Sequence, residues 1–540
     1  MASTLPAGVD VRAIPSSVWV LLALAWLATL AWRPLLEPDE ARYAEIPREM
    51  VASGDWVTPR LNALKYFEKP PLQYWATAAA YSLFGVGEAA ARLWSCALAF
   101  LCIPLVYAFA RYLYGDGAQA IAAAAILAVN PYFAIIGQLN ILDSGFCFFV
   151  VAALFSFMRA RTCEPRSGPE RGWMALSAAS LALAVLSKGI VALVLIGGTL
   201  VIHMLVTRDL RHLRRWHLLV TIPVFLAITV PWFIVVSQRN PEFPQFFFIH
   251  EHFQRFLTDE ADREGPWWFF FPWLLFALVP WLVPIWGARG PLRWQRPTDD
   301  VGVARAMLWT WCAFVLFFFS ISHSKLPTYI LPMMPALAVL IAPYLVKRSS
   351  STPLAAWITG GLLLLAAIGL IVGAHHKAGA IPSPLLIWSI VGAGIGIAGA
   401  LGARKSWIAA ALGSVLGFQA LMMAYSNFPP VRNSKGLVAA ARPSIGPDTQ
   451  LFSVNQYRQG VAPYLGRTLR MVMFRGELAF GIEQESAGFI PTLEQFIEQW
   501  TAAADAVAFV DPATFQDLSA RNVPMRPLAR DGRSVVVARK

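Results

Sequence analysis

Two groups of acidic, basic and aromatic residues follow the first apolar stretch of the chain. Residues 37–45 read EPDEARYAE, and residues 66–71 read YFEKPP. Carboxylates in such groups act as bases or hold a charged substrate, whereas lysine, arginine and tyrosine side chains hold phosphate oxygens. The alternative for Asp39 and Glu40 is structural, because acidic residues that follow Pro38 at the start of a helix complement the helix dipole.

Further polar residues lie within a few positions of other apolar stretches, namely Asp143, His250, Glu251, His252, Arg255, His323, Lys325 and Tyr329. Charged groups at the edge of hydrocarbon are costly, and by default they mark a function or a water-filled cavity. For Asp143 the alternative is an N-cap of the helix that follows. For Lys325 the alternative is contact with a lipid headgroup.

His250 and His252 raise the question of a metal site. At positions i and i+2 the two histidines point to opposite sides of a helix, so they share one ion only on a strand or a loop. We therefore expect interfacial histidines and no required cofactor. The alternative is a single divalent ion such as Zn²⁺ that ties two external loops together through Glu68 and His252, with His250 beside them.

The composition identifies an integral membrane protein. Of 540 residues, 57% are hydrophobic and 14% are charged, and the mean hydropathy is +0.54. A soluble protein of this length carries far more charge. The five cysteines show no metal-ligand spacing. A length of roughly 20 apolar residues per span gives about thirteen spans, near residues 17–33, 89–112, 118–138, 143–159, 173–187, 190–206, 216–237, 267–288, 305–323, 328–346, 354–375, 383–402 and 406–425.

Basic loops orient these spans, because lysine and arginine accumulate in short cytoplasmic loops. The spans alternate without conflict if the cytoplasm holds the basic residues near 159–171, 208–215, 289–296, 347–348 and 404–405. The N-terminus is then cytoplasmic and the C-terminus lies outside. Lys188, between two short spans, is assigned to the cytoplasmic side and left out of the site. The net charge of +12 reflects these loops and anionic lipid partners rather than nucleic acid.

Three external segments follow from this topology. The loop 34–88 shows helical periodicity and a second apolar patch, Leu72–Phe84, which we expect to lie along the membrane surface. The loop 238–266 is the second segment. The third is the tail 427–540, where short strands near 451–454, 506–510 and 534–538 alternate with helices near 492–503 and 512–520. We therefore expect an all-α polytopic membrane domain, residues 1–426, and a small α/β domain, residues 427–540.

Six strings together resemble one enzyme family: residues 37–45, 66–71, 142–144 (LDS), 186–189 (LSKG), 251–256 (EHFQRF) and 325–329 (KLPTY). As a set they are similar to the GT-C glycosyltransferases, a superfamily that includes protein O-mannosyltransferases. Within it they most resemble the branch that moves 4-amino-4-deoxy-L-arabinose onto lipid A. The resemblance runs over most of residues 17–425. It implies two juxtamembrane helices above a membrane cavity that holds the sugar of a polyprenyl phosphate.

The resemblance also implies roles for individual residues. It implies Asp39 as the catalytic carboxylate, with Glu40 beside it and Asp143 as a second carboxylate. The departing polyprenyl phosphate needs cations and hydrogen-bond donors. We expect residues on the external side to supply these cations and donors and to contact the sugar. They are Arg42, Tyr43, Tyr66, Lys69, Arg255, Lys325 and Tyr329.

The implied setting is the bacterial inner membrane, with the active site and the tail domain in the periplasm. The implied partners are an undecaprenyl-phosphate-linked aminosugar as donor, lipid A as acceptor and membrane phospholipids, with no protein partner. Such a transfer lowers the negative charge of lipopolysaccharide and gives resistance to polymyxin and other cationic peptides. A phosphate acceptor needs no general base, so Asp39 is expected to position a substrate, whereas a hydroxyl acceptor would need Asp39 as base.

Two alternatives stay open at the level of sequence. One is a GT-C transferase with another polyprenyl-phosphate sugar or a protein Ser/Thr acceptor. The other, from a different class, is a lipid transporter or flippase, which predicts symmetric repeats and charges near the middle of the bilayer. Here the charges gather on one face and no matching halves are found.

Overall fold

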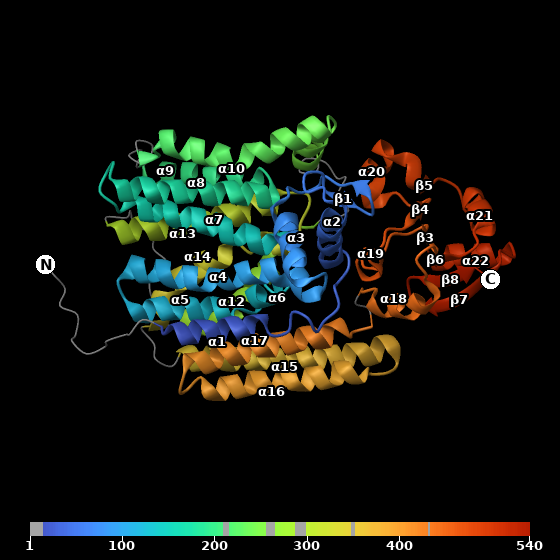
Figure 1. Cartoon of the computed structure of the whole chain (residues 1–540). Coiled ribbons are helices and arrows are strands. Elements are labelled where there is room, and N and C mark those ends of the chain that lie inside the picture. The colour runs from blue at the N-terminus through green and yellow to red at the C-terminus, as the bar shows by residue number, and fades with distance from the viewer. Residues whose placement is uncertain are drawn as a thin grey trace.

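A computed structural model describes residues 14–208, 215–254, 265–286, 299–346, 351–429 and 432–539. It has two parts, a long bundle of helices and an α/β domain that sits beyond one end of the bundle and contains the C-terminus (Figure 1). The chain leaves the last bundle helix at Ser426, next to the expected domain boundary.

Each predicted span coincides with a described helix of the bundle. Seven of the described helices, α4, α7, α10, α13, α15, α16 and α17, are long and apolar enough to cross a membrane. The prediction of an all-α polytopic membrane protein is therefore confirmed. The bundle helices are α1 (Ser16–Leu27), α4 (Glu88–Tyr114), α5 (Gly117–Val129) with α6 (Pro131–Ile136), α7 (Leu142–Arg161), α8 (Gly168–Lys188), α9 (Val191–Thr207), α10 (Leu218–Arg239), α12 (Phe270–Trp286), α13 (Asp300–Ile321), α14 (Met333–Val346), α15 (Ser351–Ala378), α16 (Ser383–Gly402) and α17 (Trp407–Ser426).

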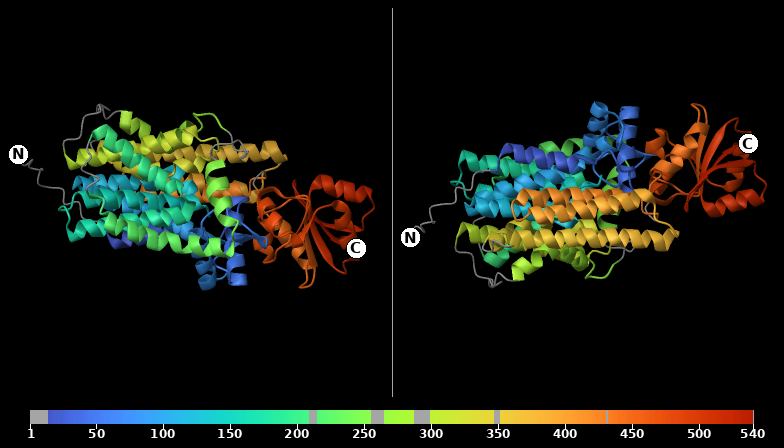
Figure 2. Two further views of the ribbon diagram at one scale, coloured as in Figure 1. Left: turned by 90° about the horizontal axis from the view of Figure 1, so that it is seen from above. Right: turned by 90° about the horizontal axis from the view of Figure 1, so that it is seen from below.

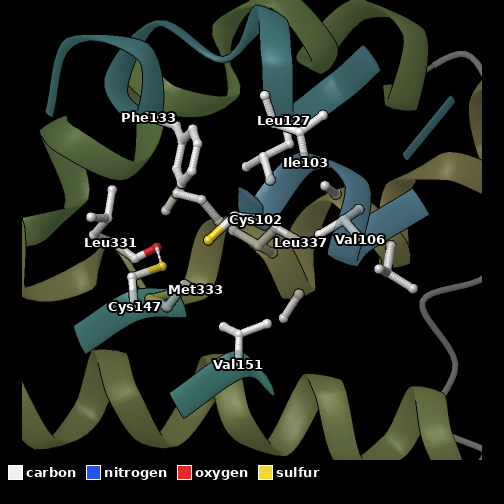
Figure 3. Close-up of a cluster of buried hydrophobic side chains, with 14 of the residues drawn as sticks. Cys102, Ile103, Val106, Leu127, Phe133, Cys147, Val151, Leu331, Met333 and Leu337 are labelled. Carbon is white, nitrogen blue, oxygen red and sulfur yellow. Dashed lines mark hydrogen bonds between the residues drawn. The ribbon is translucent and has the colours of Figure 1, made fainter. Parts of the chain in front are cut away.

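Close packing holds the bundle together, since lipid tails offer apolar side chains the same environment that a neighbouring helix does. Figure 3 shows the centre of the bundle, where Cys102 of α4, Phe133 of α6 and Cys147 of α7 lie among aliphatic side chains. The Cys147 thiol donates to the carbonyl of Leu331, 3.7 Å away. Glycines let α16 and α17 approach each other, because a Cβ on Gly413 would overlap the Cα of Gly399.

The first external loop covers the bundle end that faces the α/β domain. It contains α2 (Asp39–Ser53), a hairpin of β1 (Arg60–Leu61) and β2 (Leu64–Lys65), and α3 (Leu72–Phe84). Figures 1 and 2 show α2 and α3 between the bundle helices and the α/β domain. Helix α2 begins after Pro38 and ends at Gly54, whose φ of +72° suits glycine. The predicted apolar patch, Leu72–Phe84, forms helix α3.

The tail forms a mixed sheet of six strands in the order β5-β4-β3-β6-β8-β7, in which β8 runs antiparallel to both of its neighbours, β6 and β7. The predicted strands and helices of the tail are confirmed, but β4, β5 and β7 are additional. Strands β4 and β5 are too short to show an alternation of apolar residues, and β7, with the sequence MRPLAR, has none. The elements are α18 (Lys435–Ala441), β3 (Gln450–Val454), α19 (Val461–Leu465), β4 (Arg470–Val472), η5 (Gly476–Leu478), α20 (Ala479–Gln484), β5 (Phe489–Ile490), α21 (Leu493–Ala502), β6 (Ala506–Val510), α22 (Pro512–Ala520), β7 (Met525–Arg530) and β8 (Val535–Arg539).

The α/β domain docks firmly on the first external loop. Arg60 of the hairpin pairs with Glu485 at 2.7 Å. The Asn62 side chain donates to the carbonyl of Leu469 and accepts from the backbone N–H of the same residue, both at 2.8 Å. Phe480 of α20 stacks on aromatic rings of both external loops. These contacts tie the domain to the loop that carries Asp39.

A buried carboxylate, Glu49, supports the hairpin from α2. It accepts the backbone N–H groups of Asn62 at 2.6 Å and Ala63 at 2.8 Å, two residues with positive φ in the turn of the hairpin. Glu45 lies one turn earlier on α2. Burial and the Glu45 charge raise the pKa of Glu49 to about 8.

This raised pKa predicts that stability falls as pH rises. Below the ordinary pKa of a glutamate, Glu49 is neutral in both the folded and the unfolded state, and its full contribution is present. Between that value and about pH 8 the folded state holds a proton that the unfolded state has lost, so stability decreases. Thermal unfolding of detergent-purified protein from pH 5 to 9 should show this slope, and Glu49→Gln should flatten it. Exposed Glu498→Gln is the control. An unchanged slope in Glu49→Gln contradicts the prediction.

Candidate functional site

A cavity of about 740 Å³ lies at the bundle end beneath the first external loop. Its wall has a charged part and an apolar part. The charged and polar side chains come from α2, the 68–69 segment, α7, α8, η2 (Gln245–Gln254) and the segment before α14. Those that sequence reasoning singled out are Asp39, Arg42, Tyr43, Glu68, Lys69, Asp143 and Tyr329.

An ion pair between Asp143 and Lys188 forms one side of the charged wall. Both side chains are largely buried, and the Lys188 ammonium also lies over the Tyr329 ring, 4.5 Å from its centroid. Asp143 is not an N-cap, because Ile141 holds that position on α7. The placement of Lys188 away from the site was wrong. Counting the spans would have placed Lys188, at the end of α8, on the same face as Asp143.

A second pair, between Lys69 and Glu251, forms another side at 3.4 Å. The Lys69 ammonium also donates to the Glu68 carbonyl at 2.7 Å, which fixes its direction. Glu251 is only 5% exposed and comes from the π-helical segment η2. The two external loops therefore meet at the cavity. Glu251 was noted in the sequence but not assigned to the site.

Asp39 is the more exposed carboxylate of the wall, with 39% of its side chain accessible. Arg42, one turn later on α2, lies 3.3 Å from it and also pairs with Glu477 of the α/β domain. Gln459 donates to the other oxygen of Glu477. Burial raises the pKa of Glu477 even though Arg42 opposes the shift. Since Glu477 is distant in sequence, no local signal points to it.

Glu40 belongs to a buried network and does not line the cavity, so its predicted catalytic role is corrected. Its carboxylate accepts from Arg92 at 2.7 and 2.9 Å, from the Asn140 backbone at 2.9 Å and from Arg33 at 3.4 Å. Burial alone would raise the pKa of Glu40, but Arg92 and Arg33 outweigh it and lower the pKa to about 2. Glu40 thus stays ionised and fixes α2 on α4.

Two further predicted substrate contacts do not reach the cavity. Tyr66 is buried behind Arg42, whose guanidinium lies 5.9 Å from the centre of the tyrosine ring. The Lys325 ammonium donates to the Ser322 carbonyl instead, and Lys325 is only 7% exposed. Arg255 lies outside the described residues.

The metal hypothesis remains a prediction. His250 is partly exposed and stacks on Phe246, and the side chain of His252 lies outside the described part of the chain. Among the described residues no group of three or more His, Cys, Asp and Glu side chains is arranged to hold an ion.

The apolar part of the cavity wall was not predicted. It is formed by Ile190, Val191 and Val194 around the start of α9 and by Phe318 and Phe319 near the end of α13. Val194 is 40% exposed, so neighbouring side chains do not cover this part of the wall. Such residues look like any lipid-facing part of a span, and the sequence gives no signal that separates them.

Comparison with known proteins shows close relatives across nearly the whole chain. An undecaprenyl phosphate-α-4-amino-4-deoxy-L-arabinose arabinosyl transferase from Edwardsiella ictaluri is 32% identical over 505 residues, which cover 88% of this chain and 89% of the relative. The chain belongs to this arabinosyltransferase family. It is therefore a glycosyltransferase, and the resemblance inferred from the six strings is confirmed.

Solved structures and family models agree with this placement. The crystal structure of ArnT from Cupriavidus metallidurans bound to undecaprenyl phosphate contains a chain that is 34% identical to this one, with a TM-score of 0.85 over 97% of both chains. An oligosaccharyltransferase from Archaeoglobus fulgidus, 14% identical with a TM-score of 0.51 over 84% of this chain and 64% of its own, shares the fold alone. Residues 437–539 match the aminoarabinose transferase C-terminal domain, and residues 11–247 match dolichyl-phosphate-mannose-protein mannosyltransferase.

Removing the Lys188 charge should reduce transfer strongly. Lys188→Met leaves the Asp143 carboxylate without its partner and removes a cation from the cavity wall. We expect kcat to fall about 100-fold, the usual effect of deleting one stabilising donor from an active site. Lys435→Met, which removes a half-exposed lysine on the α/β domain, is the matched control and should stay within about twofold of wild type. Equal rates for the two variants would show that Lys188 is not part of the site.

Glu477 should set the acidic limb of the pH–rate profile. As pH falls through its raised pKa, Glu477 becomes neutral and releases Arg42. In wild-type protein this limb should lie above the pH at which an ordinary glutamate titrates. Glu477→Gln should remove that limb and lower the plateau rate. An acidic limb that is identical in the two proteins excludes Glu477 as its origin.

Proposed function

We propose that this arabinosyltransferase moves 4-amino-4-deoxy-L-arabinose from undecaprenyl phosphate to a phosphate of lipid A. The observation that carries the proposal is the division of the cavity wall into a charged part and an apolar part, in which the Val194 side chain is exposed. A lipid-linked sugar phosphate has the same division, with a polar head and an apolar chain. The relative from Cupriavidus metallidurans was solved with undecaprenyl phosphate bound.

The donor phosphate suits the cations of the charged wall. Lys69 and Lys188 both reach the cavity, and each is held in place by a carboxylate. Ammonium groups form strong, charge-assisted hydrogen bonds with phosphate oxygens. The prenyl chain would then lie along Val191, Val194 and Phe318 and continue into the bilayer. Contacts between these apolar groups bury no polar group, so they carry no desolvation cost.

The reaction exchanges one phosphate for another at the anomeric carbon of the sugar. An oxygen of the acceptor phosphate forms the new bond to this carbon, and the bond from the carbon to the undecaprenyl phosphate oxygen breaks. The electron pair of the broken bond stays on the departing phosphate, which leaves as a dianion near Lys69 and Lys188. Positive charge develops on the sugar ring in between, and Asp39 and Asp143 stabilise it.

Asp39 acts as a positioning and electrostatic group in this scheme rather than as a base. The acceptor phosphate is already ionised at neutral pH, so no proton has to be removed from it. The exposed Asp39 carboxylate can also hold the ammonium of the aminosugar in the cavity. Arg42 offers a cation on the same helix for the acceptor phosphate.

We place the cavity and the α/β domain in the periplasm and the chain in the bacterial inner membrane. Helix α7 supports this orientation, because it starts beside the cavity at Leu142 and ends at Arg161 in a basic loop. Helix α9 also starts beside the cavity, at Val191, and is followed by Arg208. Short basic loops mark the cytoplasmic side. Added aminosugar lowers the negative charge of lipid A, which weakens attraction of polymyxin and other cationic peptides.

The experiment is a lipid A mass analysis in bacteria that lack their own transferase. Cells that express the chain should contain lipid A with the added mass of one or two aminopentoses. Asp39→Asn should abolish this product, and Glu494→Gln on the exposed surface of the α/β domain should not. Unmodified lipid A in cells that make folded wild-type protein and the donor would refute this acceptor. Retained modification in Asp39→Asn would refute the role of Asp39.

A further inference from the structure

Glu37 lies next to the cavity but takes no part in the proposed reaction. It precedes α2 and is two residues from Asp39, yet its side chain is only 1% exposed and faces the α/β domain. A buried carboxylate is costly unless several donors satisfy it. The buried Glu37 carboxylate therefore requires several donors close by.

Every hydrogen-bond donor to the Glu37 carboxylate comes from the α/β domain, within the described residues. Arg458 donates its Nε at 2.9 Å, and the Gly460 backbone N–H donates at 3.1 Å. Arg533 approaches to 3.5 Å, and the Ser434 hydroxyl donates as well. Three separated segments of the domain thus converge on one side chain of the membrane domain.

The backbone of Glu37 is held by the same domain, since its N–H donates to the Arg432 carbonyl at 2.9 Å. Gly460 shows how closely the surfaces fit. Its φ of −78° is ordinary for any residue, but a Cβ there would lie 2.7 Å from Glu37 Oε1. A side chain at this position would therefore displace the Glu37 carboxylate, so glycine suits the position because of space and not because of backbone conformation.

These contacts fix one end of the short segment that carries Asp39. The other end is fixed by Glu40, which the Arg92 network holds on the bundle. Between these two anchors lie only Pro38, whose φ is restricted by its ring, and Asp39 itself. The direction of the Asp39 carboxylate then depends on both anchors, one from each domain.

We propose that Glu37 is a positioning residue through which the α/β domain fixes Asp39 in the cavity. The inference rests on the proposed function, and it assigns to the domain a role in the chemical step. Glu37 touches neither substrate nor reacting atoms, so it acts only through Asp39.

The test compares two interdomain ion pairs in the detergent-purified full-length protein. Glu37→Ala and Arg458→Met break the pair beside Asp39. Glu88→Ala and Lys435→Met break a second interdomain pair, 2.6 Å long, which is not next to Asp39. Transfer from undecaprenyl-phosphate-linked aminosugar to lipid A is measured for each variant, and thermal unfolding shows how much stability each has lost.

We expect kcat to fall about 10-fold or more in Glu37→Ala and Arg458→Met, because small displacements of a reacting group are costly, while KM for the donor stays within about twofold. The double variant should fall little further than the more affected single variant, since the Glu37–Arg458 pair is lost in both. Glu88→Ala and Lys435→Met should keep a kcat close to wild type. If Glu37→Ala does not fold, Glu37→Gln keeps the shape of the side chain and should still lower kcat several-fold.

Equal kcat values for the two sets of variants would overturn the inference. So would a change confined to KM, or a Glu37→Gln enzyme with the wild-type kcat. These results are distinct from a failure of the proposed function, in which wild-type protein itself would form no product from the same two substrates.

Discussion

The site depends on ion pairs between opposite charges at the end of the apolar bundle. The Asp143–Lys188 and Lys69–Glu251 pairs keep ionised groups at the edge of hydrocarbon, where an isolated charge would be neutralised or drawn to water. Each pair joins elements distant in sequence, so the cavity exists only when the helices and external loops are assembled. In the proposed reaction the cations of these pairs hold the phosphate, and Asp143 stabilises the positive charge that develops on the sugar.

The α/β domain is part of this arrangement and not an appendage. Glu477 reaches Arg42 on the cavity wall, and Arg458 and Gly460 hold Glu37 at the start of α2. A carboxylate placed between two domains contributes only when both are docked, because its donors come from the partner surface. Residues 437–539 match the C-terminal domain of the aminoarabinose transferase family, to which the chain belongs.

Sequence reasoning found most of the fold because long apolar stretches and basic loops report directly on spans. It also found Asp39, Arg42, Lys69 and Asp143, which the structure brings to one cavity. It failed where tertiary contacts decide. Glu40 was predicted to be a catalytic residue beside Asp39, but its charge is balanced by Arg92, which lies 52 residues later in the chain.

Lys188 and Glu477 were missed for different reasons. Lys188 sits beside a glycine at the end of a helix and looked like a simple helix terminus, although the alternation of spans already places it with Asp143. Glu477 had no signal at all, because its partner Arg42 is on the far side of the chain in sequence and only the docked domain brings them together. The apolar wall was hidden for a third reason, since lipid-facing and ligand-facing residues have the same composition.

The position of the cavity on the periplasmic side is tested most directly by site-specific labelling with a membrane-impermeant maleimide in cells with a permeabilised outer membrane. Single cysteines at positions 69 and 188 are compared with one at position 161, after the five native cysteines have been replaced. Positions 69 and 188 should be labelled from the periplasm, and position 161 only after the inner membrane is opened. Labelling of position 69 or 188 only from the cytoplasm, or labelling of position 161 from the periplasm, would contradict the proposed arrangement of the site.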